Sequence, residues 1–187
     1  MSSCKRGTQD YDPVSKSDRE NAIARLDDQE SASTIIIADV SGSMRGDKIE
    51  RLRRELKNLW PEITARLLAF SDRMHWCDGP SDLPNPMGGT NLKLAFETVA
   101  ALWPSEVILV SDGRPQDEQG ALDAAELIPG TISVLFVGDE SDSTGADFMR
   151  CLAALGGGLF AHRDLAKNLA IDENLRAMLS LPAPIAL

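Results

Sequence analysis

Short, uninterrupted apolar runs recur along the chain from residue 34 onward. They cover residues 34–38, 66–70, 107–110 and 132–137, and two shorter runs cover 74–77 and 158–161. Runs of this length are typical of strands that are buried on both faces of a sheet. The segment 74–77 is predicted to pair with 66–70, and 158–161 is predicted to add a short further strand.

Amphipathic segments between these runs predict helices. Apolar residues recur at helical spacing within 47–60, 92–103, 120–128, 148–155 and 164–181. Asp47 is predicted to cap the first helix, with Glu50 completing a capping box, and Lys48 is predicted to belong to a solvated basic face. Strands that alternate with helices predict an α/β fold, a doubly wound, mostly parallel central sheet flanked by helices on both faces.

The first 32 residues differ from the rest, because they are polar and charged with few apolar positions. They are predicted to form a polar N-terminal leader, with a short helix near 18–28. The length of 187 residues fits one domain, which we place at 33–181 and follow by a short tail at 182–187. The N-terminus lacks the apolar stretch of a secretory signal, so we expect a cytoplasmic protein.

The net charge of the chain and the positions of its cysteines and histidines exclude several classes of partner and site. Lys and Arg number 19 and Asp and Glu 29, a net charge of −10, so neither nucleic acid nor an anionic membrane surface is expected as a partner. Cys4, Cys77 and Cys151 match no zinc or redox spacing and are predicted to be reduced thiols. His75 and His162 have no partners at ligand spacing and are predicted to be surface or packing residues.

Oxygen-bearing side chains follow two of the predicted strands. Asp39, Ser41 and Ser43 come directly after the first strand, Asp112 follows the run 107–110, and Thr90 opens a helix between them. In a doubly wound sheet, ligands bind beyond the carboxyl ends of the strands, where the strand order reverses. Carboxylate and hydroxyl oxygens select Mg²⁺, Mn²⁺ or Ca²⁺ rather than zinc or copper. These residue types are also common turn formers, which is the competing interpretation.

The order of three short motifs resembles a known family. DVSGS at 39–43, GGT at 88–90 and SDG at 111–113 are similar to the metal-ion-dependent adhesion site (MIDAS) of von Willebrand factor A (vWA) domains. The resemblance covers about residues 33–162 and implies an intact site. It implies Ser41, Ser43 and Thr90 as ligands, with Asp39 and Asp112 acting directly or through water. The glycines at 88 and 89 are expected to let the backbone approach this site.

The resemblance implies a protein-binding module rather than an enzyme. A bound divalent cation would capture an Asp or Glu carboxylate of a partner protein. Because the chain carries little besides this domain, an intracellular bacterial or phage-type relative is expected. One alternative is an assembly subunit in which the metal is purely structural. The other is a Mg²⁺-dependent phosphoester hydrolase, but such enzymes place a second Asp where Ser41 stands and need a Lys near the site. A Lys or Arg head group in the place of the ion would argue against a metal site.

Overall fold

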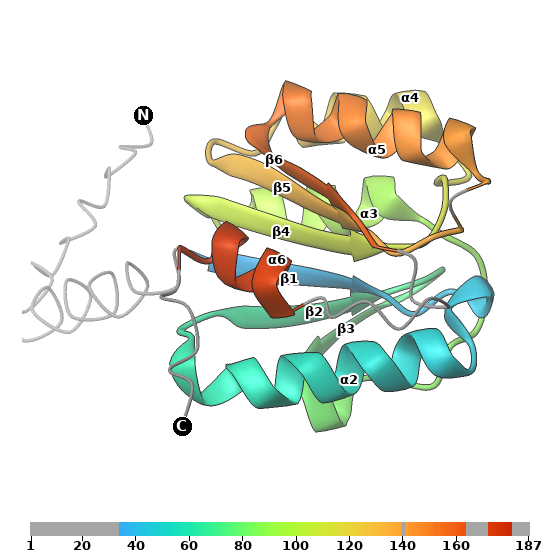
Figure 1. Ribbon diagram of the computed structural model, residues 1–187. Coiled ribbons are helices and arrows are strands. Elements are labelled where there is room, and N and C mark those ends of the chain that lie inside the picture. The colour runs from blue at the N-terminus through green and yellow to red at the C-terminus, as the bar shows by residue number, and fades with distance from the viewer. Residues whose placement is uncertain (1–33, 140, 164–171, 181–187) are drawn as a thin grey trace, which may run out of the picture. The chain divides into compact units, whose positions relative to one another are not determined.

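Six strands form one sheet in the order β3-β2-β1-β4-β5-β6 (Figure 1). Their bounds are Thr34–Asp39 for β1, Arg66–Phe70 for β2, Met74–Cys77 for β3, Glu106–Ser111 for β4, Thr131–Phe136 for β5 and Gly157–His162 for β6. Strand β3 is antiparallel to β2, and the other neighbours are parallel. The predicted mostly parallel α/β sheet is confirmed, including the pairing of 74–77 with 66–70.

The computed structural model describes residues 34–139, 141–163 and 172–180, all of which belong to the unit Ala32–Leu187. The predicted leader, its helix at 18–28 and the tail at 182–187 therefore lie outside the described residues, as does Cys4. Of the helix predicted at 164–181, the structure describes α6, Asp172–Met178. None of the helices in the described part of the chain is long and apolar enough to cross a membrane.

The central strand β1 explains why the sheet is covered on both sides. Ile35, Ile36 and Ile37 are each at most 1% exposed. Successive side chains of a strand point to opposite faces, so Ile35 and Ile37 join one apolar cluster and Ile36 joins the other. A strand that is apolar at every position is stable only when both faces are buried.

Helices supply the two covers. Helices α2 (Asp47–Leu59) and α6 pack on one face, and α3 (Leu92–Ala100), α4 (Glu118–Ala125) and α5 (Ser143–Leu155) pack on the other (Figure 1). Helix α2 buries Ile49, Leu52, Leu56 and Leu59, which follow the helical spacing seen in the sequence. Because these four residues lie on one side of the helix, the charged residues of α2 occupy the opposite side.

The beginnings of the helices differ in how they are capped. Asn91, Asp117 and Asp142 each accept a backbone N–H of the first turn of α3, α4 and α5. The prediction that Asp47 caps α2 is wrong: Gly46 is the N-cap, with φ of 77°, and Asp47 is the first helical residue. The left-handed backbone at Gly46 is readily adopted by glycine. Asp47 still favours the helix through its negative charge in the first turn.

Candidate metal centre

The predicted site lies where the strand order reverses. Strands β1 and β4 are neighbours in the sheet, although β2 and β3 lie between them in the sequence. From this pair the chain winds outward to β2 on one side and to β5 on the other. Asp39 is the last residue of β1, and Asp112 directly follows the last residue of β4. This is the crevice in which doubly wound proteins bind ligands.

A continuous set of hydrogen bonds joins the two strand ends. Asp39 accepts the backbone N–H of Ser41 on Oδ1 at 2.7 Å and the hydroxyl of Ser111 on Oδ2 at 2.6 Å. The hydroxyls of Ser41 and Ser43 lie 3.0 Å apart, and Ser43 donates to Oδ1 of Asp112 at 2.7 Å. A hydroxyl has one proton. Because the Ser43 hydroxyl donates to Asp112, Ser41 is the donor in the hydrogen bond between the two serines. The lone pairs of Ser43 remain available to a cation.

The cluster is buried at its base and open at one residue. Asp39, Ser41 and Asp112 are 0%, 2% and 7% exposed, whereas Ser43 lies on the surface. The two carboxylates are therefore shielded from water while the hydroxyl between them faces it. An external group reaches the cluster from the side of Ser43.

Burial strongly affects Asp39. It raises the pKa of this carboxyl to about 6, against the lowering effect of the Ser111 and Ser41 hydrogen bonds. The negative charge of Asp112 raises the pKa of Asp39 further. The hydrogen-bond donors to Asp39 are a hydroxyl and an amide, neither of which carries a formal charge. Asp39 is therefore a buried carboxylate that a nearby cation would stabilise in its charged form.

Thr90 lies in the neighbouring loop, half-buried. Its carbonyl accepts the backbone N–H of Gln116 at 3.1 Å, which ties this loop to the one after β4. Within the described residues, the Thr90 hydroxyl makes no hydrogen bond to the other predicted ligands. The structure thus joins Ser41, Ser43 and Asp112 through side chains and Asp39 through the amide of Ser41, and it ties Thr90 to the loop after β4 through its backbone.

Two glycines allow the loops around the site to approach each other. The carbonyl of Gly88, whose φ is 76°, accepts the backbone N–H of Gly42 at 3.0 Å. A Cβ on Gly88 would lie 2.3 Å from a carboxylate oxygen of Asp72, and one on Gly89 would lie 2.3 Å from Nε2 of Gln116. A side chain at either position would have to displace the end of the Asp72 or Gln116 side chain, and the positive φ of Gly88 favours glycine there.

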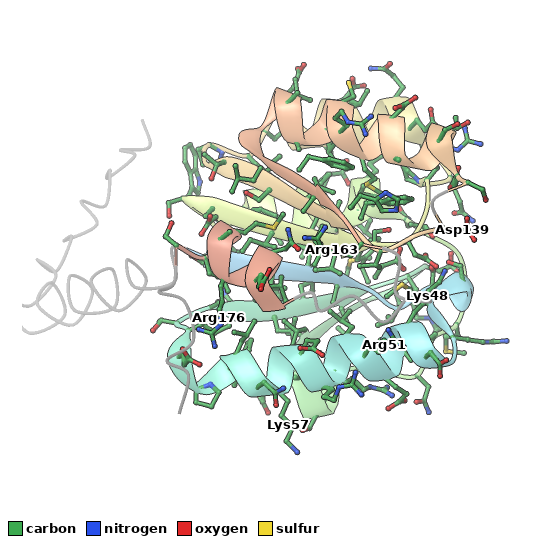
Figure 2. The ribbon with its side chains drawn as sticks, viewed as in Figure 1. Lys48, Arg51, Lys57, Asp139, Arg163 and Arg176 are labelled. Carbon is green, nitrogen blue, oxygen red and sulfur yellow. The ribbon has the colours of Figure 1, made fainter. Side chains whose placement is uncertain are left out.

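Lys48 is a member of the site that sequence analysis missed. Lys48, labelled in Figure 2, was predicted to be part of a solvated face, but its ammonium forms an ion pair with Oδ2 of Asp112. The lysine side chain is 33% exposed and the aspartate side chain 1%. This partly meets the condition set above as evidence against a metal site, because a lysine head group occupies one carboxylate oxygen. The other oxygen of Asp112 stays with Ser43, so a cation at Oδ2 has to displace Lys48.

Further residues organise the site without having been singled out as ligands. Ser111 was noted only as part of the SDG motif, yet its hydroxyl holds Asp39. Asp72, after β2, accepts the backbone N–H of Gly89 at 2.9 Å and so fixes the glycine loop. The position of Asp72 two residues beyond a predicted strand was the signal that could have identified it.

The two histidines differ from each other. His162 packs against Phe136 with the rings tilted at 45° and their centroids 5.0 Å apart, and its Nε2 lies 3.1 Å from the carbonyl of Gly138. The prediction of a packing residue is confirmed for His162. His75 lies on the surface, as predicted, but its imidazole is close to Cys77 and Asp82, a proximity that the sequence spacing does not reveal.

The donor set fits a hard divalent cation. Two carboxylates and two hydroxyls come together, and they are joined to the loop that carries a third hydroxyl. All are oxygen donors of the kind that Mg²⁺, Mn²⁺ and Ca²⁺ prefer. A cation would stabilise the buried carboxylate of Asp39, and the exposed hydroxyl of Ser43 makes the cluster accessible from the solvent.

Comparison with solved structures identifies the fold. The von Willebrand factor type A structure from Catenulispora acidiphila superposes with a TM-score of 0.63 at 18% sequence identity. The chain has a von Willebrand factor A fold. The match covers 80% of this chain but 42% of that protein's length. The vWA fold predicted from the three motifs is thereby supported.

Other comparisons add little. The response regulator domain of Thermotoga maritima CheB matches with a TM-score of 0.38 and 13% identity, over 81% of this chain and 99% of that one, which is too weak to carry an argument. A scan against protein-family models finds no match, and a search of curated proteins finds no similar sequence.

Proposed function

We propose that this vWA domain is a metal-dependent protein-binding module with an intact MIDAS. Asp39, Ser41, Ser43, Thr90 and Asp112 would hold a divalent cation, Mg²⁺ or alternatively Mn²⁺ or Ca²⁺. An Asp or Glu carboxylate of a partner protein would complete its shell. The observation that supports this best is the continuous hydrogen-bonded cluster between the ends of β1 and β4. The proposal implies a non-enzymatic protein without nucleic-acid or membrane partners, of intracellular bacterial or phage type and cytoplasmic.

The residues divide the work according to their charge. The hydroxyls of Ser41 and Ser43 are neutral ligands, so a cation bound to them would keep enough charge to attract an external carboxylate. Asp112 orients Ser43 by accepting a hydrogen bond from its hydroxyl, which directs the oxygen lone pairs away from that carboxylate. The cation's contribution is that of a Lewis acid that offers a position to an anionic oxygen.

The acidic surface does not exclude an acidic ligand. The net charge of −10 is spread over the chain, and exposed charges are screened within about 8 Å at physiological salt. A direct metal–oxygen contact is about 2.1 Å long. The local attraction therefore dominates binding, while the acidic surface slows the encounter.

Metal titration of the full chain tests the first half of the proposal. Calorimetry with Mg²⁺ and electron paramagnetic resonance with Mn²⁺ are expected to show a site that Asp39→Ala abolishes. Asp147→Ala is the matched control, because this aspartate is 73% exposed on α5, outside the site. No metal binding in the wild type, or equal binding in the Asp39 variant, would refute the site.

Binding of a carboxylate tests the second half. Capture from lysate in Mg²⁺ and in chelator yields candidate partners, and one candidate is then purified and its acidic residues are replaced one at a time by the corresponding amide. We expect one such replacement to abolish the metal-dependent complex, as does Asp112→Ala in this chain. If the metal is purely structural, Ser41→Ala will instead lower thermal stability without weakening any complex.

One contact bears on the phosphoester hydrolase alternative. Lys48 beside Asp112 supplies the lysine that this chemistry needs. The position of the second carboxylate is still held by Ser41, whose hydroxyl is bonded to Ser43. A phosphatase assay in Mg²⁺ separates the two functions: activity that Asp39→Asn removes would favour the hydrolase.

A further inference from the structure

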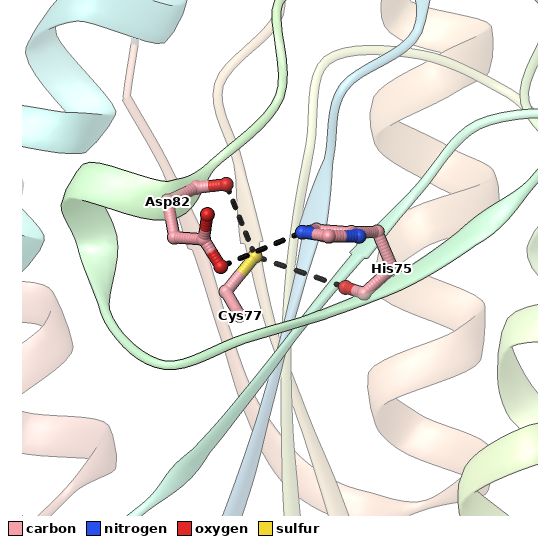
Figure 3. A group of neighbouring side chains, drawn as sticks. All are labelled: His75, Cys77 and Asp82. Atoms are coloured by element: carbon pink, nitrogen blue, oxygen red, sulfur yellow. Dashed lines mark hydrogen bonds and ion pairs between the residues drawn. The ribbon is translucent and has the colours of Figure 1, made fainter.

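Three side chains with different donor atoms meet beside the edge strand β3: His75, Cys77 and Asp82 (Figure 3). An imidazole nitrogen, the thiol sulfur and a carboxylate oxygen all lie within 4.8 Å of one another. Nε2 of His75 is 3.5 Å from Oδ2 of Asp82. Cys77 is buried, whereas the side chains of the other two are about half exposed, so the group is open to solvent on one side.

Local structure brings these residues together. His75 and Cys77 are two positions apart on a strand, and side chains at this spacing share a face. The chain then turns through a short 3₁₀ helix, Pro80–Asp82, which returns Asp82 toward the strand. The spacing of the three residues resembles no standard zinc motif, which is why the sequence did not reveal them.

The turn that carries Asp82 is anchored on α2. Arg53 donates from Nη2 to the carbonyls of Leu83 at 2.8 Å and Pro84 at 3.0 Å. The same guanidinium pairs through Nη1 with Glu50 at 2.7 Å. A fixed arginine therefore holds the segment just after Asp82, so the three donors are positioned by the fold before any ligand binds.

We propose that His75, Cys77 and Asp82 form a binding site for a borderline transition-metal cation, with Zn²⁺ as the best match. Nitrogen, sulfur and oxygen donors together suit Zn²⁺, and three protein ligands leave a fourth position for water or an external group. Tetrahedral bonds of the usual zinc lengths separate ligand atoms by about 3.4 to 3.6 Å. The histidine and aspartate already match this separation.

Metal binding requires the thiol of Cys77 to replace its S–H bond with a metal–sulfur bond. The sulfur of Cys77 lies 3.7 Å from the backbone carbonyls of both His75 and Asp82, and its single S–H can donate to either of them. On metal binding, the S–H bond breaks, the proton passes to the buffer and the electron pair of the sulfur forms the metal–sulfur bond. No oxidant or reductant is involved.

This site is independent of the cluster at β1 and β4. That cluster contains only oxygen donors and suits hard cations, whereas a thiolate favours softer ones. The two sites are therefore distinguishable by the metal used as a probe. Failure of one proposal leaves the other standing.

Cobalt spectroscopy on the full chain under reducing conditions tests the proposal. One equivalent of Co²⁺ is expected to give a sulfur-to-cobalt charge-transfer band, which Zn²⁺ then displaces. Cys77→Ser removes the band, and Cys151→Ser, whose thiol is exposed on α5, retains it as the control. Asp39→Ala also retains the band, which separates this site from the MIDAS.

A second variant protects the test against misfolding. His75 lies on the surface, so His75→Ala is expected to fold normally and to weaken zinc binding at least about tenfold, because even the loss of an outer-shell partner costs about 10- to 100-fold. Absence of the band in the wild type, or its persistence in Cys77→Ser, would overturn the proposal. Unchanged zinc affinity in His75→Ala would do so as well.

Discussion

Replacing Lys48 with Met tests whether its ammonium occupies part of the proposed cation site. Lys48 pairs with Oδ2 of Asp112, while Oδ1 stays bonded to Ser43. Methionine keeps a similar apolar stem and removes the charge. We expect Lys48→Met to destabilise the metal-free protein and to bind Mg²⁺ more tightly than the wild type, because the cation no longer displaces an ammonium.

The burial of the two partners sets the size of the effect. The Lys48 side chain is 33% exposed and the Asp112 side chain 1%, so the pair lies between an exposed and a buried ion pair. Exposed pairs contribute about 0–1 kcal/mol, and breaking a buried one costs about 3–5 kcal/mol. We therefore expect the free energy of unfolding to fall by about 1–2 kcal/mol, which lowers Tm by about 2–8 °C.

The stability that Lys48→Met loses in the metal-free state should appear as a higher affinity of the variant for Mg²⁺. In the metal-bound state a cation replaces the ammonium at Asp112 in both proteins, so their bound forms have similar stability. A difference of about 1–2 kcal/mol in the metal-free state then corresponds to about 5- to 30-fold tighter Mg²⁺ binding in the variant.

Calorimetric titration measures the Mg²⁺ affinity, and thermal unfolding measures the stability of the metal-free protein. Lys57→Met is the matched control, since Lys57 lies on the same helix and points away from the sheet (Figure 2). It should leave both quantities unchanged. Equal or weaker Mg²⁺ binding by Lys48→Met would show that the ammonium does not compete with the cation, and the reasoning would fail.

Other substitutions probe the site and the core. Between pH 3.8 and about 6 the folded protein holds more protons at Asp39 than the unfolded chain does, so the contribution of Asp39 to stability falls as the pH rises through this window, by about 3 kcal/mol. Asp39→Asn should abolish that fall in metal-free urea unfolding, and a parallel fall in both proteins would contradict it. Ser111→Ala removes a buried hydrogen bond to a carboxylate and should lower the free energy of unfolding by about 1.5–3 kcal/mol. It should also weaken Mg²⁺ binding, and a change in packing alone would not produce both effects together. Leu52→Ala should cost about 2–5 kcal/mol in urea unfolding, whereas Leu94→Ala, at a residue 38% exposed, should cost far less.

Much of the fold could be predicted because its strands are locally encoded. Apolar runs such as Ile35–Ile37 have no polar position that would suit a solvated face, so they specify a doubly covered sheet. The predicted site followed from the same logic: Asp39 ends β1 and Asp112 directly follows β4, and parallel strands end at one edge. Distant residues could be brought together this way without knowledge of any side-chain contact.

The contacts that sequence analysis missed depend on tertiary geometry. Lys48 is one of several basic residues on α2, and nothing local distinguishes the one that reaches Asp112. The wrong cap at Asp47 came from a strong local signal, which the left-handed turn at Gly46 overrides. His75 and Asp82 become neighbours only after the strand has ended and the chain has turned back.

The state of Asp39 argues against a plain turn at the end of β1. An uncharged Asn or Ser could accept the amide of Ser41 in such a turn. A buried carboxylate whose pKa is raised to about 6 instead costs stability at neutral pH, and its own donors are neutral. Lys48 pairs with Asp112 and not with Asp39. A divalent cation beside both carboxylates would lower the pKa of Asp39 and reverse this cost. The buried charge therefore supports the proposed cation site over a plain turn.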